Sequence, residues 1–515
     1  MNLMKAMATV AGMTGLSRVA GFARDILTAS ILGAGPIADA FFVALKLPNM
    51  FRRITAEGAF NVSFVPLYGE ALEKEGADKA NAFAGNALSI MLWALSGFTV
   101  LMLLVMPWVI YAIAPGFSDD PLRYDMAVEL ARVTFPYLLL MSMVTLFGGV
   151  LNAHERFAPF AAAPILFNLS LIGALLFLTP LMQTAGHAMA WGVLGAGLLQ
   201  LGLLYICTKR AGIKIRLVKP QFDARTKKLF KLMLPGVLGA GVMQINLFAD
   251  LIMASFLESG SISYLYYADR LNQLPLGIVG IAVGTALLPM LSRAISAGKA
   301  EEARNLFNRA FEVCFLLALP AAVALMIIPH QLVGGLFEYG AFDAYDARLT
   351  AMVLMGYAVG LPAYVVARVF QVAYWANHDT STPVKISMVT TGVNIALSLT
   401  LIQFIGVIGI ALATGVAGWL QLYLLRRGLK GQAVSVFDEK LRKSIVRIIA
   451  SSAIMGAGLI VMTAAFDMFI PQGPKIFEIF SLVLLVCFGL ILYGFSVLAT
   501  GAVRKDEIKS YFKRT

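Results

Sequence analysis

The chain has 515 residues, of which 59% are hydrophobic and 14% are charged, and its mean hydropathy is +0.80. Soluble domains have about 25% charged residues, so this composition excludes an ordinary soluble protein and indicates an integral membrane protein. The net charge of +12 lies mostly in a few short loops between apolar segments. It therefore does not require nucleic acid as a partner, and none is expected.

Apolar runs recur from one end of the chain to the other, and one helical crossing of a bilayer needs about 20 such residues. They predict an all-α polytopic membrane protein with about fourteen transmembrane helices. The expected spans are 6–32, 36–69, 80–114, 123–152, 158–179, 187–208, 229–257, 262–295, 305–337, 346–376, 383–404, 407–425, 445–467 and 477–503.

Positive charge gathers in the loops that follow even-numbered spans. Residues 209–231 and 426–447 carry most of it and residues 504–514 add more, whereas loops after odd-numbered spans offer only Arg123, Arg348 and Lys475. Cytoplasmic loops retain Lys and Arg, so both termini are expected in the cytoplasm. A lipid-headgroup or partner site is the alternative explanation of the basic clusters, and it stays open.

An internal repeat divides the chain. RDILTASIL at 24–32 aligns with ADLIMASFL at 249–257, and FVPL at 64–67 aligns with LLPM at 287–290. Two lobes of six helices with the same orientation are expected, with the substrate site between them. The expected parts are an N-terminal lobe at 1–208, a basic cytoplasmic linker at 209–228, a C-terminal lobe at 229–428, and two further helices with a cytoplasmic tail at 429–515.

The first two spans carry many charges for membrane helices: Arg18, Arg24, Asp25, Asp39, Lys46, Arg52, Arg53 and Glu57. Each charge at the centre of such a helix costs about 2.5–3.5 kcal/mol, so these side chains are expected to line a wet cavity. On one helix, Asp39, Lys46 and Arg53 share a face, although Pro48 interrupts it. Internal ion pairs could neutralise these charges, but the surplus of cations favours an anion site.

The second copy of the repeat lacks most of these cations, and its main intramembrane charges are Asp250, Asp269, Arg270 and Arg368. We expect the anion site to include arginines of both lobes, namely Arg18, Arg24, Arg52 and Arg270. Arginine suits a diphosphate because its planar guanidinium donates two parallel hydrogen bonds to phosphate oxygens. Arginines on two lobes suit a large amphiphilic anion that stays bound while the two lobes change their relative orientation.

Asp250 lies alone in the middle of an apolar span. It is paired with a distant arginine, or protonated, or part of a coupling-cation site with Asn394 and Thr414 as oxygen donors on other helices. The coupling ion is then Na⁺ or H⁺, or the membrane potential acts instead, and no other cofactor is expected. Catalysis is not expected, because the four histidines lack metal-ligand spacing and no Walker A motif is present.

Four aromatic residues, Tyr264, Tyr266, Tyr267 and Trp375, have two interpretations. They stack on a sugar of the substrate, or they anchor the helices at the membrane interface, where tyrosine and tryptophan are enriched.

Several motifs are specific in combination: SRVAGFARD at 17–25, DAFFVALKLPN at 39–49, RR at 52–53, AEGAF at 56–60, YYADRL at 266–271 and TPVK at 382–385. With them the chain closely resembles the MurJ (MviN) family over essentially its whole length. That family comprises the bacterial flippases for lipid II, the undecaprenyl-diphosphate-linked peptidoglycan precursor.

The resemblance implies the multidrug/oligosaccharidyl-lipid/polysaccharide exporter fold, alternating access, and two extra C-terminal helices that form a groove for the lipid tail. It implies that Arg18, Arg24, Arg52 and Arg270 are essential cavity cations and that Asp25 and Asp39 belong to their cluster. Arg53, Glu57 and Asp269 complete the expected site. Gln273 replaces a Glu of some relatives, so an acidic role there is not implied.

The implied function is movement of lipid II from the cytoplasmic to the periplasmic leaflet of the bacterial inner membrane, in peptidoglycan synthesis. The implied partners are lipid II, membrane lipids and the cell-wall synthesis machinery, and a monomer is expected. A cation-coupled exporter of another polyprenyl-linked glycan or a drug is the alternative, and it does not need the arginine cluster. An enzyme acting on lipid-linked sugar needs catalytic acid or histidine pairs on the periplasmic side, and none is identified there in the sequence.

Overall fold

The structure is a computed structural model that describes residues 3–430, 436–469 and 475–503. Some side chains inside these ranges, including those of 55–58 and 278–286, lie outside the description. The described ranges are helical and contain no β-strand, which confirms the predicted all-α membrane fold. By contacts they divide into two compact units, which are described separately: unit 1 (Met1–Ser263, Tyr339–Phe342) and unit 2 (Tyr264–Glu338, Asp343–Thr515).

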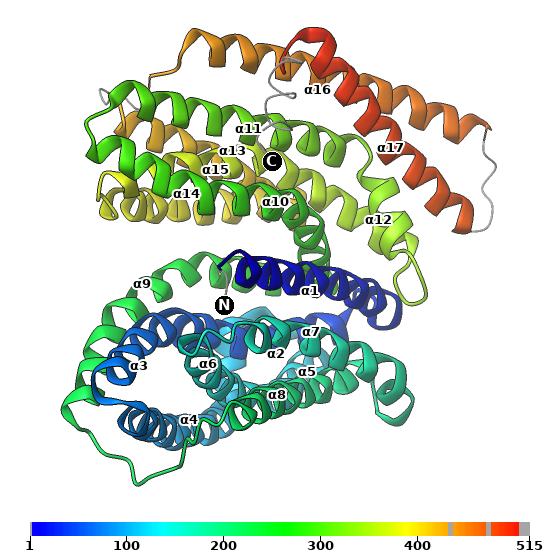
Figure 1. The fold of residues 1–515 in the computed structure, drawn as a ribbon. Coiled ribbons are helices and arrows are strands. Elements are labelled where there is room, and N and C mark those ends of the chain that lie inside the picture. The colour runs from blue at the N-terminus through cyan, green and yellow to red at the C-terminus, as the bar shows by residue number, and fades with distance from the viewer. Residues whose placement is uncertain (1–2, 431–435, 470–474, 504–515) are drawn as a thin grey trace. The chain divides into compact units, whose positions relative to one another are not determined.

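Unit 1 is a helical bundle, coloured blue to green in Figure 1. Within it α2 packs on α5, α7 packs on both α1 and α8, and α9 packs on the π-helix η1. Its elements are α1 (Leu3–Leu32), α2 (Pro36–Phe51), η1 (Arg52–Phe60), α3 (Asn61–Glu75), α4 (Ala77–Ile113), η2 (Pro115–Asp119), α5 (Pro121–Thr134), α6 (Tyr137–Ala153), α7 (Ala158–Gly173), η3 (Ala174–Leu178), η4 (Thr179–Leu181), α8 (Ala185–Arg210) and α9 (Ala224–Ser255).

Unit 2 is built around α13, which packs on α11, α12 and α15. Its helices are α10 (Ser261–Ser296), which begins in unit 1, α11 (Ala300–Ile327), α12 (Pro329–Phe337), α13 (Ala344–Ala376), α14 (Ser381–Ile405), α15 (Val407–Gly428), α16 (Glu439–Phe469) and α17 (Lys475–Thr500). Glycines let α13 and α15 approach closely, because a Cβ on Gly360 would lie 2.5 Å from the Cα of Gly415. Asp343 starts α13 with a capping box that includes Asp346.

Ten helical segments of the described residues are long and apolar enough to cross a membrane. They correspond to ten of the predicted spans. The other four predicted spans correspond to α1, to α2 with η1 and α3, to α9 and to α10, so the count of fourteen crossings stays a prediction. The lobe boundaries drawn from the repeat also stay predictions.

The basic linker between α8 and α9 is bound along α4. The amide of Asn86 exchanges two hydrogen bonds with the backbone of Gln221, at 2.7 and 2.8 Å, and Ser89 Oγ accepts from the Val218 amide at 3.0 Å. Close approach depends on Gly85, where a Cβ would lie 2.3 Å from the carbonyl oxygen of Arg216. The linker is therefore held by backbone hydrogen bonds, a feature that its basic composition does not reveal.

Replacing Gly85 with Ala should loosen the linker, because overpacking of a tight contact costs about 1–3 kcal/mol. We expect trypsin to cleave residues 211–223 of the purified protein about fivefold faster or more, the factor that about 1 kcal/mol of opening free energy gives. Gly97→Ala on the same helix is the control, since nothing lies within 4 Å of a Cβ there. Equal cleavage rates for the two variants would contradict this account of the linker.

Candidate functional site

Arg24 is held in the interior of unit 1. Its Nη2 and Nε donate to Asp25 Oδ1 at 2.6 and 3.2 Å, and its Nη1 donates to Asn168 Oδ1 at 2.9 Å. Arg24 and Asp25 are only 8% and 4% exposed. A buried charge without such a partner is strongly destabilising, because no favourable interaction offsets the free-energy cost of removing it from water. The predicted cation and the predicted carboxylate of α1 are thus brought together.

Asn168 on α7 joins this cluster and was missed from the sequence. Its Nδ2 donates to the Ser17 carbonyl oxygen at 2.9 Å, so one amide side chain connects two points of α1. The sequence does carry a signal for Asn168, since it is an isolated amide inside an otherwise apolar predicted span. A buried polar group in a membrane helix needs a hydrogen-bond partner, so such a residue is expected to contact another polar side chain.

The remaining cations of the first two predicted spans differ in exposure. Arg18 and Arg53 are exposed, whereas Lys46 and Arg52 are partly buried. Arg52 and Arg53 begin η1, whose hydrogen bonds run from i to i+5. The side chain of Glu57 lies outside the described residues.

Residues predicted to share a face differ in exposure. Asp39 is 0% exposed, Lys46 is partly buried and Arg53 is exposed. Arg53 lies in the π-helix η1, whose hydrogen-bond register differs from that of α2, so the predicted common face stays a prediction. Such segments occur frequently at functional sites, which agrees with the arginines placed here.

Asp39 binds the first turn of α10. Its Oδ2 accepts from the Gly260 amide at 2.7 Å, and its Oδ1 accepts from the amide and the hydroxyl of Ser263 at 2.9 and 2.7 Å. A carboxylate at a helix N-terminus satisfies amides that have no partner in the helix and interacts favourably with the helix dipole. Asp39 therefore positions the segment that leads out of unit 1.

Arg123 supports the same region and was also missed, because the sequence gave it only a loop position. It is 7% exposed, and its Nη1 donates to the Leu257 carbonyl oxygen at 3.2 Å. Its Nε lies 2.9 Å from Asp120 Oδ2, and its Nη1 lies 3.9 Å from Asp39 Oδ2. Arg123 thus ties the start of α5 to the end of the α9 segment.

The turn between α1 and α2 is also contacted by residues 339–342. The Ala341 amide donates to the Ser30 carbonyl oxygen at 2.7 Å. Gly33 and Gly340 have φ of +70° and +59°, and a Cβ on either would lie within 2.6 Å of a backbone oxygen of the other segment. Positive φ and this contact both require glycine.

Arg270 and Asp269 lie on the part of α10 that belongs to unit 2. The Arg270 guanidinium carbon lies 4.7 Å from the centre of the Tyr266 ring, and Nη2 donates to the Tyr266 hydroxyl at 3.1 Å. Gln273 donates to Asp269. A cation over an aromatic face is stabilised by the ring quadrupole. Tyr266 therefore orients the arginine that the sequence assigned to the anion site.

The other aromatic candidates have structural partners or surface positions. Tyr264 is buried and donates to Asp346 Oδ1 at 2.9 Å, and Tyr267 is buried against Phe337 with ring centres 5.3 Å apart. Trp375 is 42% exposed. The burial of Tyr264 and Tyr267 favours packing over stacking on a sugar.

The three candidate cation ligands fall into two groups. Asn394 and Thr414 are neighbours in unit 2, with Thr414 Oγ1 3.5 Å from Asn394 Oδ1. Asp250 lies in unit 1, where Asn246 Nδ2 is 3.5 Å from its Oδ2. Within the ranges described, no group of three or more His, Cys, Asp and Glu side chains is arranged to hold a metal ion.

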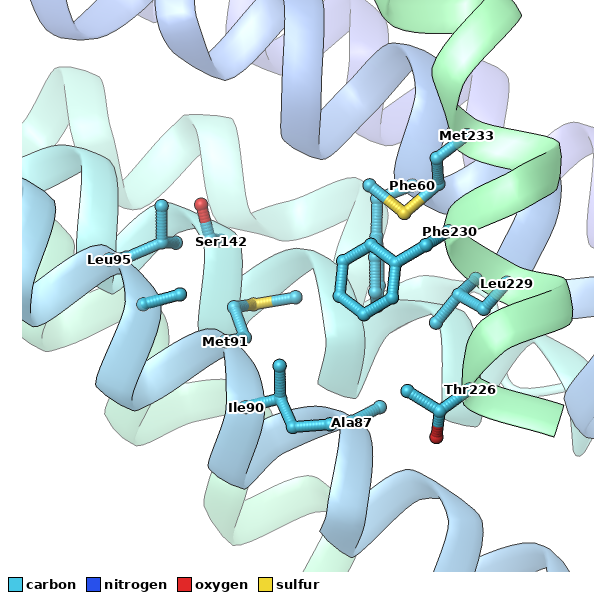
Figure 2. Close-up of a pocket in the computed structure, with 11 residues that line it drawn as sticks. Phe60, Ala87, Ile90, Met91, Leu95, Ser142, Thr226, Leu229, Phe230 and Met233 are labelled. Atoms are coloured by element: carbon cyan, nitrogen blue, oxygen red, sulfur yellow. The ribbon is translucent and has the colours of Figure 1, made fainter. Parts of the chain in front are cut away.

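An apolar cavity of about 150 Å³ lies elsewhere in unit 1, between α4, η1, α6 and α9 (Figure 2). Phe60, Met91, Phe230 and Met233 point toward one another around it, and Ser142 and Thr226 are its polar residues. No charged side chain lines it. This lining suits hydrocarbon and not an anion.

Replacing Asp39 with Ala should destabilise the protein more than replacing it with Asn, which keeps one acceptor oxygen. Hydrogen bonds to a charged group contribute about 1.5–3 kcal/mol each, and Asp39 accepts three. We expect the thermal unfolding temperature in detergent to fall in the order wild type, Asp39→Asn, Asp39→Ala. Glu73→Ala, which removes an exposed carboxylate, should have almost no effect. An unchanged unfolding temperature for Asp39→Ala would refute the capping role.

The chain is similar to known proteins over most of its length. The family model of the lipid II flippase MurJ matches residues 28–477. A probable lipid II flippase MurJ of Rhizobium tropici is 39% identical over 521 residues, covering 100% of this chain and 97% of that protein. Its counterpart in Rhizobium meliloti is 41% identical, covering 90% of this chain and 87% of that protein.

Two solved structures share the fold. A lipid II flippase MurJ in an inward closed conformation has a TM-score of 0.78 and 24% identity, covering 95% of this chain and 97% of that one. An inward-facing multidrug resistance MATE family transporter of the MOP superfamily has a TM-score of 0.68 and 14% identity, covering 86% of this chain and 99% of that one. The sequence matches over most of the chain show that it belongs to the MurJ family of lipid II flippases.

Proposed function

We propose that this protein moves lipid II from the cytoplasmic to the periplasmic leaflet of the bacterial inner membrane by alternating access. Membership of a transporter family supports the substrate and argues against an enzyme. The observation that carries the proposal is the set of arginines placed on α1, η1 and α10 of a membrane fold. Both termini are proposed to be cytoplasmic, because the basic loops follow even-numbered spans.

The diphosphate of lipid II fits the way in which Arg24 is held. In this structure Asp25 neutralises Arg24 through two hydrogen bonds to one carboxylate oxygen. A phosphate oxygen offers the same guanidinium an equivalent charge-assisted bond. When phosphate takes the place of Asp25, the Asp25 carboxylate must take up a proton or find another partner, because it would otherwise be left as a lone buried charge. Asn168 keeps its bond to Nη1 during such an exchange and fixes the plane of the guanidinium.

Arg270 is proposed to bind the diphosphate as well. The Tyr266 ring and hydroxyl hold its guanidinium plane on α10. A planar fork held in this way binds a diphosphate with two parallel hydrogen bonds, which the point charge of lysine does not provide. Monomeric action and contact with the cell-wall synthesis machinery stay predictions.

Arg24→Ala and Arg270→Ala should each abolish growth of a flippase-depleted strain while the protein still inserts. The corresponding Lys variants should restore growth only in part, because lysine lacks the bidentate fork. Transbilayer movement of lipid II in proteoliposomes should follow the same order. The control is Arg348→Ala, which removes an exposed arginine. Normal growth of both Ala strains would refute the proposed role of the two arginines. Transport of an unrelated drug at the same rate as lipid II would favour the alternative, an exporter of another solute.

Asp250 is proposed to couple transport to a cation or to the membrane potential. Moving one charge through the field yields about 2.3 kcal/mol per 100 mV, which is enough to bias a two-state equilibrium about fiftyfold. We expect Asp250→Asn to keep lipid II binding but to lose the dependence of transport on a Na⁺, H⁺ or voltage gradient. Asn394→Ala and Thr414→Ala should give weaker versions of this loss.

Asp125→Asn serves as the control for Asp250→Asn, since Asp125 is an exposed carboxylate at the start of α5. Gradient dependence should be unchanged in this variant. If Asp250→Asn transport responds to the gradients as wild type does, the coupling group lies elsewhere in the chain.

A further inference from the structure

A polar cavity of about 350 Å³ lies in unit 2 where the first turns of α16 meet the end of α17. It shares no residue with the arginine cluster or with the candidate cation ligands. Its lining residues come from α11, from α16 and from the turn after α17: Glu312, Glu439, Lys440, Lys443, Ser444, Arg447, Gly501 and Ala502.

One face of α16 supplies most of the polar wall. Lys440, Lys443, Ser444 and Arg447 are spaced by one, three or four residues, so they lie on adjacent turns of the same side of the helix. Ile448 on α16 belongs instead to an apolar cluster with Val497 and Ala502. The cavity is therefore bounded by a packed apolar layer and by cationic side chains.

The carboxylates near the cavity already have partners. Glu312 pairs with Arg309, which also binds both carboxylate oxygens of Asp438 at 2.7 and 2.9 Å. Glu439 Oε1 lies 2.6 Å from Lys443 Nζ. The pKa of Asp438 lies below its usual range, because hydrogen bonds from the Leu441 amide and Arg309 together outweigh the effect of burial. Asp438 therefore stays ionised and keeps Arg309 engaged outside the cavity wall.

Arg447 is partly buried and has a neutral partner. Its Nη1 donates to the carbonyl oxygen of Gly501 at 2.8 Å, so a carbonyl group at the C-terminal end of α17 has a hydrogen-bond partner. This bond to a neutral group does not compensate the positive charge of the guanidinium. Three cations line the cavity against two carboxylates, so the lining carries a surplus of one positive charge.

Ser444 provides an independent indication of a ligand. It is only 4% exposed and lies in the cavity wall, yet its hydroxyl has no hydrogen-bond partner in the described part of the protein. Buried hydroxyl groups almost always have a partner in the protein, in water or in a ligand. A hydroxyl donor beside a guanidinium and an ammonium group suits an acceptor with several oxygens, such as a phosphate.

We propose that this cavity binds the phosphodiester head group of a membrane phospholipid through Lys443, Ser444 and Arg447. A phosphodiester is anionic and offers several acceptor oxygens to the Ser444 hydroxyl and the Arg447 guanidinium. The cavity lies where the apolar spans Glu439–Phe466 and Lys475–Thr500 begin and end, and the ends of membrane spans are where basic side chains meet lipid head groups. The proposal does not depend on the transported substrate, and it gives part of the basic cluster at 426–447 a role besides topology.

The test measures thermal unfolding of the purified full-length protein in detergent through its tryptophan fluorescence. Short-chain phosphatidylglycerol, the matching diacylglycerol without phosphate, and inorganic phosphate are added separately. The site variant combines Lys443→Gln with Ser444→Ala. The matched control is Arg442→Gln, which removes an exposed cation next to the site that does not line the cavity. If the double variant does not survive purification, Ser444→Ala alone replaces it.

Phosphatidylglycerol is expected to raise the unfolding temperature of the wild type and of Arg442→Gln equally, and at least half of this rise should be lost in the site variant. Diacylglycerol should give no rise. A rise with inorganic phosphate that the site variant loses would support the phosphate site and assign it to the free anion. Equal rises in the wild type and the site variant, or no rise with any phosphate compound, would overturn the proposal.

Discussion

A charge inside a membrane helix needs a partner, and this requirement organises both compact units. Arg24 has Asp25 and Asn168, Asp39 has the first turn of α10, and Arg270 has the ring and hydroxyl of Tyr266. The partner is in each case polar and placed within hydrogen-bond distance. Two of these contacts join separate helices, Arg24 of α1 to Asn168 of α7 and Asp39 of α2 to the start of α10, and a lone buried charge is strongly destabilising, so they favour these helices as neighbours.

The same requirement explains how a membrane protein can handle an anionic substrate. An arginine that is already paired with a carboxylate is stable without ligand. Asn168, which is neutral, gives the guanidinium of Arg24 a further hydrogen bond. A cavity lined by unpaired arginines would instead pay a large desolvation penalty whenever substrate is absent.

The basic loops have structural contacts as well as a topological signal. The linker after α8 is held on α4 by Asn86 and Ser89 and by the absence of a side chain at Gly85. The loop before α16 is held on α11, where Phe437 packs on Phe311 and the Arg426 guanidinium lies 4.6 Å from the centre of the Phe437 ring. These contacts use backbone amides and aromatic faces, so the number of lysines and arginines in a loop does not predict them.

The sequence by itself determined the membrane class, the all-α fold and the family, and it predicted an anion site built from arginines. It could do so because apolar length and the energy of a charge in hydrocarbon act locally on each segment. Only the tertiary structure decided which charges are paired. It made Asp39 a cap for α10, brought Asn168 to Arg24, and began a π-helix at Arg52. These outcomes depend on contacts between residues more than a hundred positions apart or on a change of helical register, and no local pattern encodes either.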